Sequence, residues 1–134
     1  MSGAALAAAA EALIGCPFRL HGRDGARGLD CVGLIACALE AVGRPIVVPD
    51  RYGLRRQSIG RLAAVERKAG LVAAEGPVEP GDILLVRPGP GQFHFAIALT
   101  GGAFVHAHAG LGRVVRTPGP LNWPTERHWR LFTE

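Results

Sequence analysis

Asp30 and Cys31, within "GLDCVGLIACALE", are the residue pair with the clearest chemical potential in the chain. Asp30 is a good N-cap, so Cys31 is expected at the first position of a helix. Free backbone N–H groups and the helix dipole favour negative charge there. A thiolate is therefore favoured, and a neighbouring imidazolium lowers a thiol pKa further. From the helix alone, Cys31 is explained equally well as a nucleophile and as a small buried residue.

The other two cysteines, Cys16 and Cys37, complete neither a disulfide framework nor a recognised zinc motif. Cys37 follows Cys31 by six residues, about 120° round a helix, so these thiols do not share a face, and we expect Cys37 in the core. Cys16, with His21 nearby, could bind a metal together with Cys31, but no ligand spacing supports this. We therefore expect no metal, and an odd number of cysteines favours a reduced compartment.

A thiolate nucleophile needs a base, and the base needs a third group that orients it. His94 interrupts the predicted strand "FHFAIAL" on its alanine-bearing face, and His106 and His108 share one face of the next strand. A two-residue turn at positions 101–102 would put His94 and His106 on opposite faces, whereas a three-residue loop at 100–102, or a bulge, gives them a common face. In that second register His108 lies opposite His94 and His106 is two residues away. The sequence leaves the register and the orienting histidine open.

The elements that must position these residues follow from periodicity and from the glycines and prolines between them. We expect a surface loop at 16–28, and the strands are short and separated at hairpin spacing. Helices followed by an antiparallel sheet define an α+β fold, and 134 residues suit a single domain over 1–134. The pattern predicts helices at 4–14, 31–42 and 58–69, and strands at 82–86, 93–99, 103–108, 112–116 and 129–132.

Composition narrows the class of protein further. The net charge of +4 favours acidic partners, but aromatic residues make up 6% and no nucleic-acid motif is present, so we expect a solvated basic helix face and no nucleic-acid site. No apolar run reaches the roughly 18 to 20 residues of a membrane span. The Ala-rich beginning has no basic residue before its apolar run and contains Glu11, so we interpret it as part of the mature protein and not as a signal peptide.

Five stretches together resemble the NlpC-type family of papain-like bacterial cell-wall peptidases. They occur in the family's order over about residues 5–116, and the chain is most similar to the short subgroup in phage tails and phage-like gene-transfer particles. The most specific parts are the Asp-Cys-x-Gly-Leu box, the Pro-Gly-Asp strand entry and two histidines twelve residues apart. The stretches are "GCPFRLHG", "GLDCVGLI", "VEPGDILLV", "FHFAIAL" and "FVHA".

The resemblance implies a papain-like NlpC-type domain, with helices that place Cys31 against an antiparallel sheet carrying the histidines. It implies Cys31 as nucleophile, His94 as base and His106 as the residue that orients His94, with His108 second in line. The implied reaction is hydrolysis of an amide in the peptidoglycan stem peptide, typically between D-glutamate and the diamino acid. The Cys31 backbone N–H would help to hold the oxyanion, and His94 would protonate the leaving amine, with no cofactor needed.

The candidate substrate-binding residues are Asp30, Phe18, His21 and His108. The family usually has tyrosine at the position of Phe18, serine at that of Val32, and Trp-Gly-Gly where this chain has Leu20-His21-Gly22. These departures leave the three catalytic positions intact and alter the region that would recognise a free L-alanine amine. His21 is explained either as a binding residue or as an exposed loop residue.

The expected partners are a peptidoglycan stem peptide and, for a chain made in the cytoplasm without an export signal, phage-like tail proteins that deliver it to the cell wall. Two alternatives remain. One is a different enzyme on the same scaffold, either a wall amidase or an acyltransferase acting on lipid. The acyltransferase would need a long apolar groove or a membrane anchor. The other is a non-catalytic tail or wall-binding module, which loss of Cys31 or His94 would have favoured.

Overall fold

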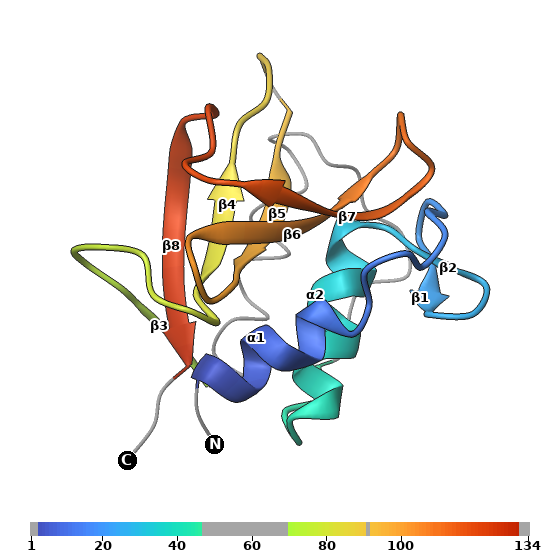
Figure 1. The fold of residues 1–134 in the computed structure, drawn as a ribbon, viewed down its shortest axis with the longest axis horizontal. Helices are drawn as coiled ribbons and strands as arrows, with labels where there is room; N and C mark the ends of the chain where they lie inside the picture. Colours follow the sequence, from blue (N-terminus) through green and yellow to red (C-terminus); the bar gives the residue numbers. More distant parts are fainter. Residues whose placement is uncertain (1–2, 47–69, 91, 132–134) are drawn as a thin grey trace.

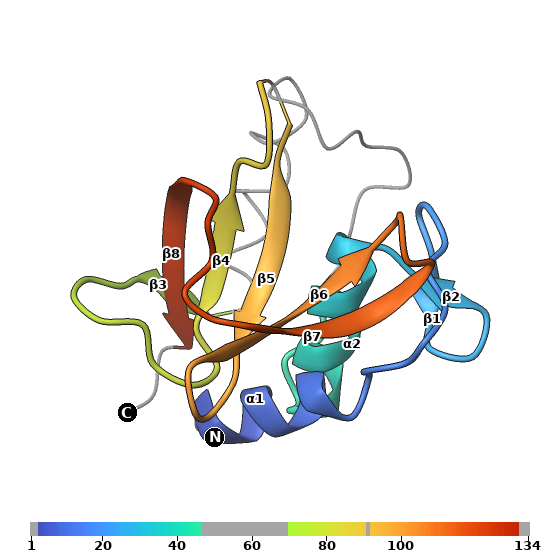
Figure 2. The ribbon, with the colours of Figure 1, turned by 45° about the horizontal axis from the view of Figure 1, so that its top comes forward.

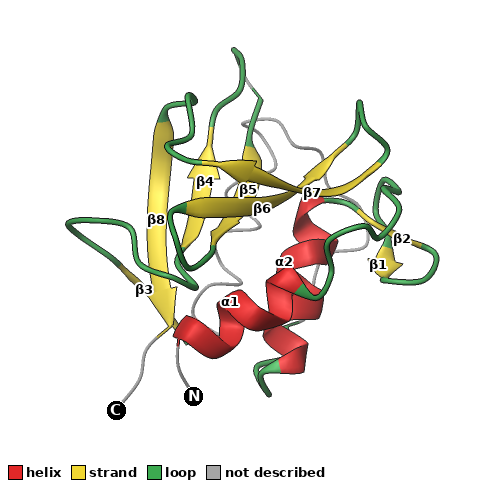
Figure 3. Cartoon of the chain, viewed as in Figure 1, coloured by secondary structure: helices red, strands yellow, loops and turns green. Residues whose placement is uncertain are grey.

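In the part of the chain that the structure describes, two helices and a six-stranded antiparallel sheet form the fold, which confirms the predicted α+β class (Figures 1 and 3). The structure, a computed structural model, describes residues 3–46, 70–90 and 92–131, so the helix expected at 58–69 lies outside the described residues. The sheet order is β3-β8-β4-β5-β6-β7, and β1 and β2 form a separate hairpin. The elements are α1 (Gly3–Glu11), β1 (Arg23–Asp24), β2 (Gly28–Leu29), α2 (Cys31–Ala41), β3 (Leu71–Ala73), β4 (Ile83–Val86), β5 (His94–Ala98), β6 (Ala103–His108), β7 (Arg113–Pro118) and β8 (Thr125–Leu131).

Helix α2 begins as the sequence predicts. The Asp30 side chain accepts a hydrogen bond of 2.8 Å from the backbone N–H of Gly33, which satisfies one of the free donors of the first turn. At the other end, Gly43 adopts a positive φ of 79°, and the N–H of Arg44 bonds back to the Leu39 carbonyl. The cap therefore fixes Cys31 as the first helical residue.

Helix α1 is shorter than expected and ends at Glu11 instead of residue 14. The N–H groups of Leu13 and Ile14 bond to carbonyls three residues back, so the chain tightens into turns there. Gly15 then takes a positive φ of 94°, and its N–H bonds to the carbonyl of Val114 in β7. The helix thus stops where the chain turns towards the sheet.

The two faces of the sheet carry different cores. One face packs against α1 and α2. In Figure 2, α1 runs below the strands and α2 rises from it where β6 and β7 cross the view. The opposite face carries a small cluster in which Leu121 and Trp123, from the segment between β7 and β8, cover the sheet. That second cluster consists of Leu84, Val86, Ala96, Ala98 and Phe104. Since His94 alternates with Phe93 and Phe95, it belongs to the second face.

The turn between β5 and β6 is the three-residue loop 100–102. Leu99 donates to the carbonyl of Ala103 at 2.8 Å, and Gly101 and Gly102 both take positive φ angles near 85° (85° and 83°). The register pairs Ile97 with Val105, so His94 and His106 share a face. The two-residue alternative is thereby excluded.

Three strand predictions need correction. Residues 16–28 were expected as a loop, but they contain β1, which pairs with β2. Strand β3 was not expected at all. Strand β8 begins at Thr125, four residues before the predicted start. The first half of β8 pairs with β4 and is exposed, which suits its polar residues. This half therefore lacks the apolar alternation that identifies a half-buried strand. No helix among the described residues is long and apolar enough to cross a membrane.

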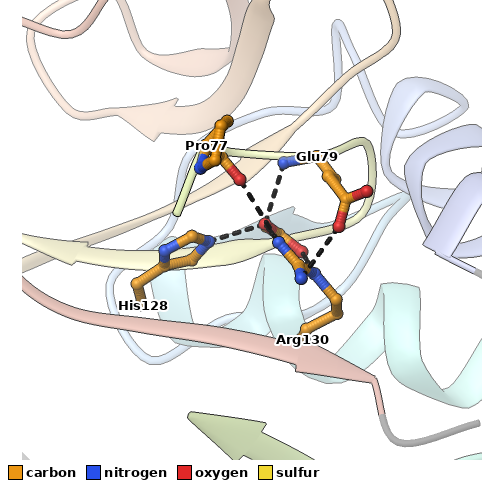
Figure 4. A network of polar contacts seen from close by, with 5 residues as sticks. Pro77, Glu79, His128 and Arg130 are labelled. Carbon is orange, nitrogen blue, oxygen red and sulfur yellow. Dashed lines mark hydrogen bonds and ion pairs between the residues drawn. The ribbon is translucent and has the colours of Figure 1, made fainter. Parts of the chain in front are cut away.

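A buried carboxylate fastens the start of β4 to β8 (Figure 4). Asp82 accepts hydrogen bonds of 2.8 Å from both Nε and Nη2 of Arg130, one of 2.9 Å from the Glu79 N–H, and lies 2.6 Å from His128 Nε2. Arg130 also pairs with the Glu79 carboxylate at 2.8 Å. Burial alone would raise the pKa of Asp82, but these hydrogen bonds outweigh it and hold the pKa below 3.8. The aspartate of the Pro-Gly-Asp strand entry, Asp82, therefore has a structural role, because it joins the start of β4 to β8.

Candidate active site

An open cavity of about 380 Å³ lies where the start of α2 meets β5 and β6. It brings together Cys31, His94 and His106, the three residues predicted to be catalytic, and also Phe18 and His108. Asp30 and His21 do not line it. The remaining lining residues are Pro88, Gln92, Ala107, Ala109, Gly110 and Trp123.

The Cys31 thiol lies at the floor of this cavity and has no solvent exposure. Burial raises its pKa from 9.0 to about 12, and the negative charge of Asp30 acts in the same direction. Backbone N–H groups of Phe95, Cys31 and Val32 lower the pKa but do not compensate. The expectation of a thiolate favoured by the helix terminus is therefore wrong for the resting state, because desolvation of the sulfur outweighs the helix dipole.

The N–H of Phe95 reaches the sulfur because β5 and β6 separate there. Their ladder consists of two pairs, Ile97 with Val105 and Ala98 with Phe104. The N–H of Leu99 donates to β6. Because every second N–H of a strand points to the same side, the N–H groups of residues 97 and 95 also point towards β6. Residue 95 lies beyond the last pair and its N–H is directed at Cys31 instead. The separation of the strands brings a thiol from the helical side and histidines from the other face to one cavity.

The histidines form a hydrogen-bonded chain that continues into β7. His94 Nε2 lies 3.0 Å from His106 Nδ1, and His106 Nε2 lies 2.8 Å from the hydroxyl of Thr117. His106 is 2% exposed, whereas His94 is half-buried. The structure thus brings His106 to His94, and the Nδ1 of His94 is the nitrogen left for the thiol.

Both members of the prospective catalytic pair are neutral near pH 7. Burial lowers the pKa of His94 from 6.5 to about 3, helped by the charges of His106 and His108. The pKa of His106 is lowered by burial and by His108. Among the described residues, no hydrogen bond joins Cys31 to His94. A thiolate–imidazolium pair of Cys31 and His94 is therefore not the resting state of this site.

Trp123 is a site residue that sequence reasoning missed. Its ring meets His94 and His106 edge to face, with centroids 5.8 and 5.7 Å away. Trp123 is half-buried, and it walls the cavity from the segment that follows β7. Edge-to-face contacts hold rings in fixed relative orientations. No periodicity or motif around residue 123 indicates this role.

His108, predicted opposite His94, is held by the turn that follows β6. Its Nδ1 accepts the N–H of Leu111 at 3.0 Å, and its ring centroid lies 5.8 Å from that of His106. The twist of the strands brings the diagonal residue, His106, into contact with His94 instead. Phe18 is half-buried at the cavity and its N–H bonds to the Gly112 carbonyl. Binding of substrate by Phe18 and His108 stays a prediction.

Asp30 is fully buried, and its carboxylate is occupied by the protein itself. Besides Gly33, it accepts the N–H of His21 at 2.8 Å and lies 3.3 Å from Nη1 of Arg23. His21 is exposed and has a positive φ of 60°, which its N–H bond to Asp30 helps to hold. Asp30 thus ties the loop before α2 to the helix start, and its contact with substrate stays a prediction.

Within residues 3–46, 70–90 and 92–131, no group of three or more metal-ligating side chains is close enough to hold a metal ion. All three cysteines are free thiols. The thiol of Cys37 lies 3.2 Å from the Arg23 carbonyl, and both Cys37 and Cys16 are half-buried against the main core. Neither of them lines the cavity of Cys31.

Comparisons with known proteins agree on one family. A sequence model of the NlpC/P60 family matches residues 15–129. Protein P54 of Enterococcus faecium is 31% identical over 108 residues, which are 80% of this chain and 18% of P54. The crystal structure of the NlpC/p60 domain of the peptidoglycan hydrolase SagA is 26% identical, with a TM-score of 0.63 over 96% of this chain and 97% of that domain. NlpC1 from Trichomonas vaginalis, 22% identical, has the same fold, with a TM-score of 0.73 over 98% of this chain and 45% of NlpC1. The chain therefore spans less than a fifth of P54 and less than half of NlpC1.

Proposed function

Because this chain belongs to the NlpC/P60 family, we propose that it is a cysteine peptidase that hydrolyses an amide bond in the stem peptides of peptidoglycan. The observation that carries the proposal is the convergence of Cys31, His94 and His106 at one open cavity. The histidines come from separate strands, and their contact of 3.0 Å supplies the oriented base that a thiol needs. The SagA domain, a peptidoglycan hydrolase by its description, supports the same substrate class.

In the proposed reaction, His94 Nδ1 takes the proton of Cys31 as the sulfur attacks the carbonyl carbon of the substrate. The buried thiol must first turn towards His94, since no hydrogen bond joins them at rest. The backbone N–H groups of Phe95 and Cys31, which act to lower the pKa of the thiol, can stabilise negative charge that develops near the sulfur. The imidazolium of His94 then protonates the leaving amine, and a water molecule hydrolyses the thioester.

We propose, as the finer specificity, the bond between D-glutamate and the diamino acid. The test incubates purified stem peptides with the protein and identifies the products by mass spectrometry, because fragment masses identify the bond. Wild type and the matched control Cys37→Ala are expected to cleave, since Cys37 lies outside the cavity. Cys31→Ala is expected to give no product and His94→Gln only traces. Equal products from Cys31→Ala and wild type would remove this mechanism.

One observation favours a second candidate, a non-catalytic wall-binding module, because the thiol has no exposure at rest. The same incubation separates the two: a module would bind sacculi and release no fragments.

We also propose that the protein works in a phage-like tail particle that meets the wall from outside. This proposal rests on the resemblance of the sequence motifs to the short tail-associated members of the family. Co-sedimentation with tail particles is the expected result, and a protein secreted alone and absent from every particle would count against it.

A further inference from the structure

Thr117, on β7, lies at the far end of the chain of polar contacts that starts at His94. Its hydroxyl is 2.8 Å from His106 Nε2, while the other ring nitrogen of His106 faces His94 Nε2 at 3.0 Å. Thr117 pairs with Phe104 across the ladder, so it stands on the same face as His106, two residues along. Both nitrogens of a nearly buried histidine are therefore engaged.

The two hydrogen bonds of His106 are linked, because a neutral imidazole carries one N–H. If Nε2–H of His106 donates to Thr117, Nδ1 of His106 must accept the Nε2–H of His94. His94 then has a bare Nδ1, which is the form able to take a proton from Cys31. If Nδ1–H of His106 instead donates to His94, the single proton of His94 moves to Nδ1, and His94 cannot act as the base.

We propose that Thr117 is a positioning residue that accepts the Nε2–H of His106 and thereby holds His94 in its basic tautomer. This inference rests on the proposed function for its kinetic consequence, although the tautomer itself exists whether or not the protein hydrolyses peptides. Without the hydroxyl, the Nε2–H of His106 would be buried with no acceptor. The Nδ1–H tautomer would then be favoured, because its proton keeps a partner in His94.

The first arm of the test reads the tautomer directly. Histidine ring nitrogen shifts, measured by nuclear magnetic resonance on ¹⁵N-labelled protein, distinguish Nε2–H from Nδ1–H without any substrate. Wild type and Thr117→Ser are expected to hold His106 as Nε2–H, and Thr117→Val is expected to shift it towards Nδ1–H. Valine keeps the shape of threonine and removes the hydroxyl. Thr117→Ala gives a second removal if the valine variant folds poorly.

The second arm measures stem-peptide hydrolysis. Thr117→Val is expected to lower kcat by about 10- to 100-fold with little change in KM, a part of the roughly 10²–10⁴-fold that a positioned base contributes. Thr117→Ser should restore most of kcat, and Thr125→Val, at an exposed threonine of β8, should match wild type. An unchanged His106 tautomer in Thr117→Val would overturn the inference. Absence of hydrolysis by wild type would overturn the proposed function and leave the tautomer result to decide the role of Thr117.

Discussion

Replacing Asp30 by alanine tests whether its carboxylate supports the fold or touches the substrate. The change removes the cap of α2, which is the acceptor of the buried Gly33 N–H and is worth about 1–2 kcal/mol, and it leaves the partly buried N–H of His21 without this acceptor, at about 1 kcal/mol. Arg23 is one-third exposed and can be hydrated, so its loss adds little. We expect the free energy of unfolding to fall by about 3 kcal/mol, or ~12 °C in Tm.

Urea denaturation and calorimetry measure this loss, and hydrolysis is assayed at a temperature where the variant is folded. Asp24→Ala is the matched control: its side chain is 58% exposed and bonds to the N–H of Ala26, so a cost below about 1 kcal/mol is expected. A folded Asp30→Ala should retain much of its kcat. If Asp30→Ala were as stable as wild type and yet inactive, the carboxylate would be a substrate ligand, and the structural reasoning would fail.

Three further predictions concern packing, pH and the cavity wall. Gly33→Ala should lower the free energy of unfolding, measured by urea denaturation, by about 1–3 kcal/mol, since its Cβ would overlap a backbone oxygen of the preceding loop. The control Gly25→Ala would place its Cβ 3.5 Å or more from its neighbours and should leave the stability unchanged. Below pH 6.5 the unfolded chain protonates His94, whereas the folded chain does not until about pH 3, so His94 alone should lower stability by up to about 1.4 kcal/mol per pH unit across that range. His106, whose pKa is also lowered, acts in the same direction, and below pH 3.8 protonation of Asp82 in the unfolded chain adds to the fall. His94→Gln should make the first part of this fall in stability less steep, as measured by urea denaturation at each pH. Trp123→Ala should lower kcat about tenfold by freeing the histidine rings, and Trp123→Phe should recover part of it.

Each of these has a result that contradicts it. Equal stability of Gly33→Ala and Gly25→Ala would mean that the loop yields without cost. A pH profile identical in His94→Gln and wild type would mean that His94 titrates normally in the folded protein. Full activity of Trp123→Ala would mean that Trp123 only packs on the surface and does not orient the histidine rings.

The sequence was sufficient to predict the start of α2, since the Asp30 cap and the Gly43 stop are local signals that the structure retains. It was sufficient for β5 and β6 because their alternating apolar residues are buried against the helices. The residues alone could not choose the orienting histidine, although the family resemblance implied His106. That choice depends on a loop register and on strand twist, which bring His106 and not its neighbour to His94.

Other features were hidden because they arise from contacts distant in the chain. The thiol pKa was predicted too low, since the helix terminus is visible in the sequence and the burial that outweighs it is not. Trp123 and Thr117 enter the site from a segment with no catalytic motif. The polar start of β8 was invisible because its partner, β4, lies about 40 residues away in the sequence.

The placement of β8 between β3 and β4 also governs the order in which the molecule can assemble. Among the described strands, β3 has β8 as its sole neighbour, so a chain emerging from the ribosome cannot anchor β3 until residue 131 has been made. Until then the edge of β4 stays open and the Asp82 carboxylate lacks Arg130. Cys31, His94, His106 and the described helices α1 and α2 all precede β8, so synthesis of β8 adds the strand that joins β3 to the rest of the sheet.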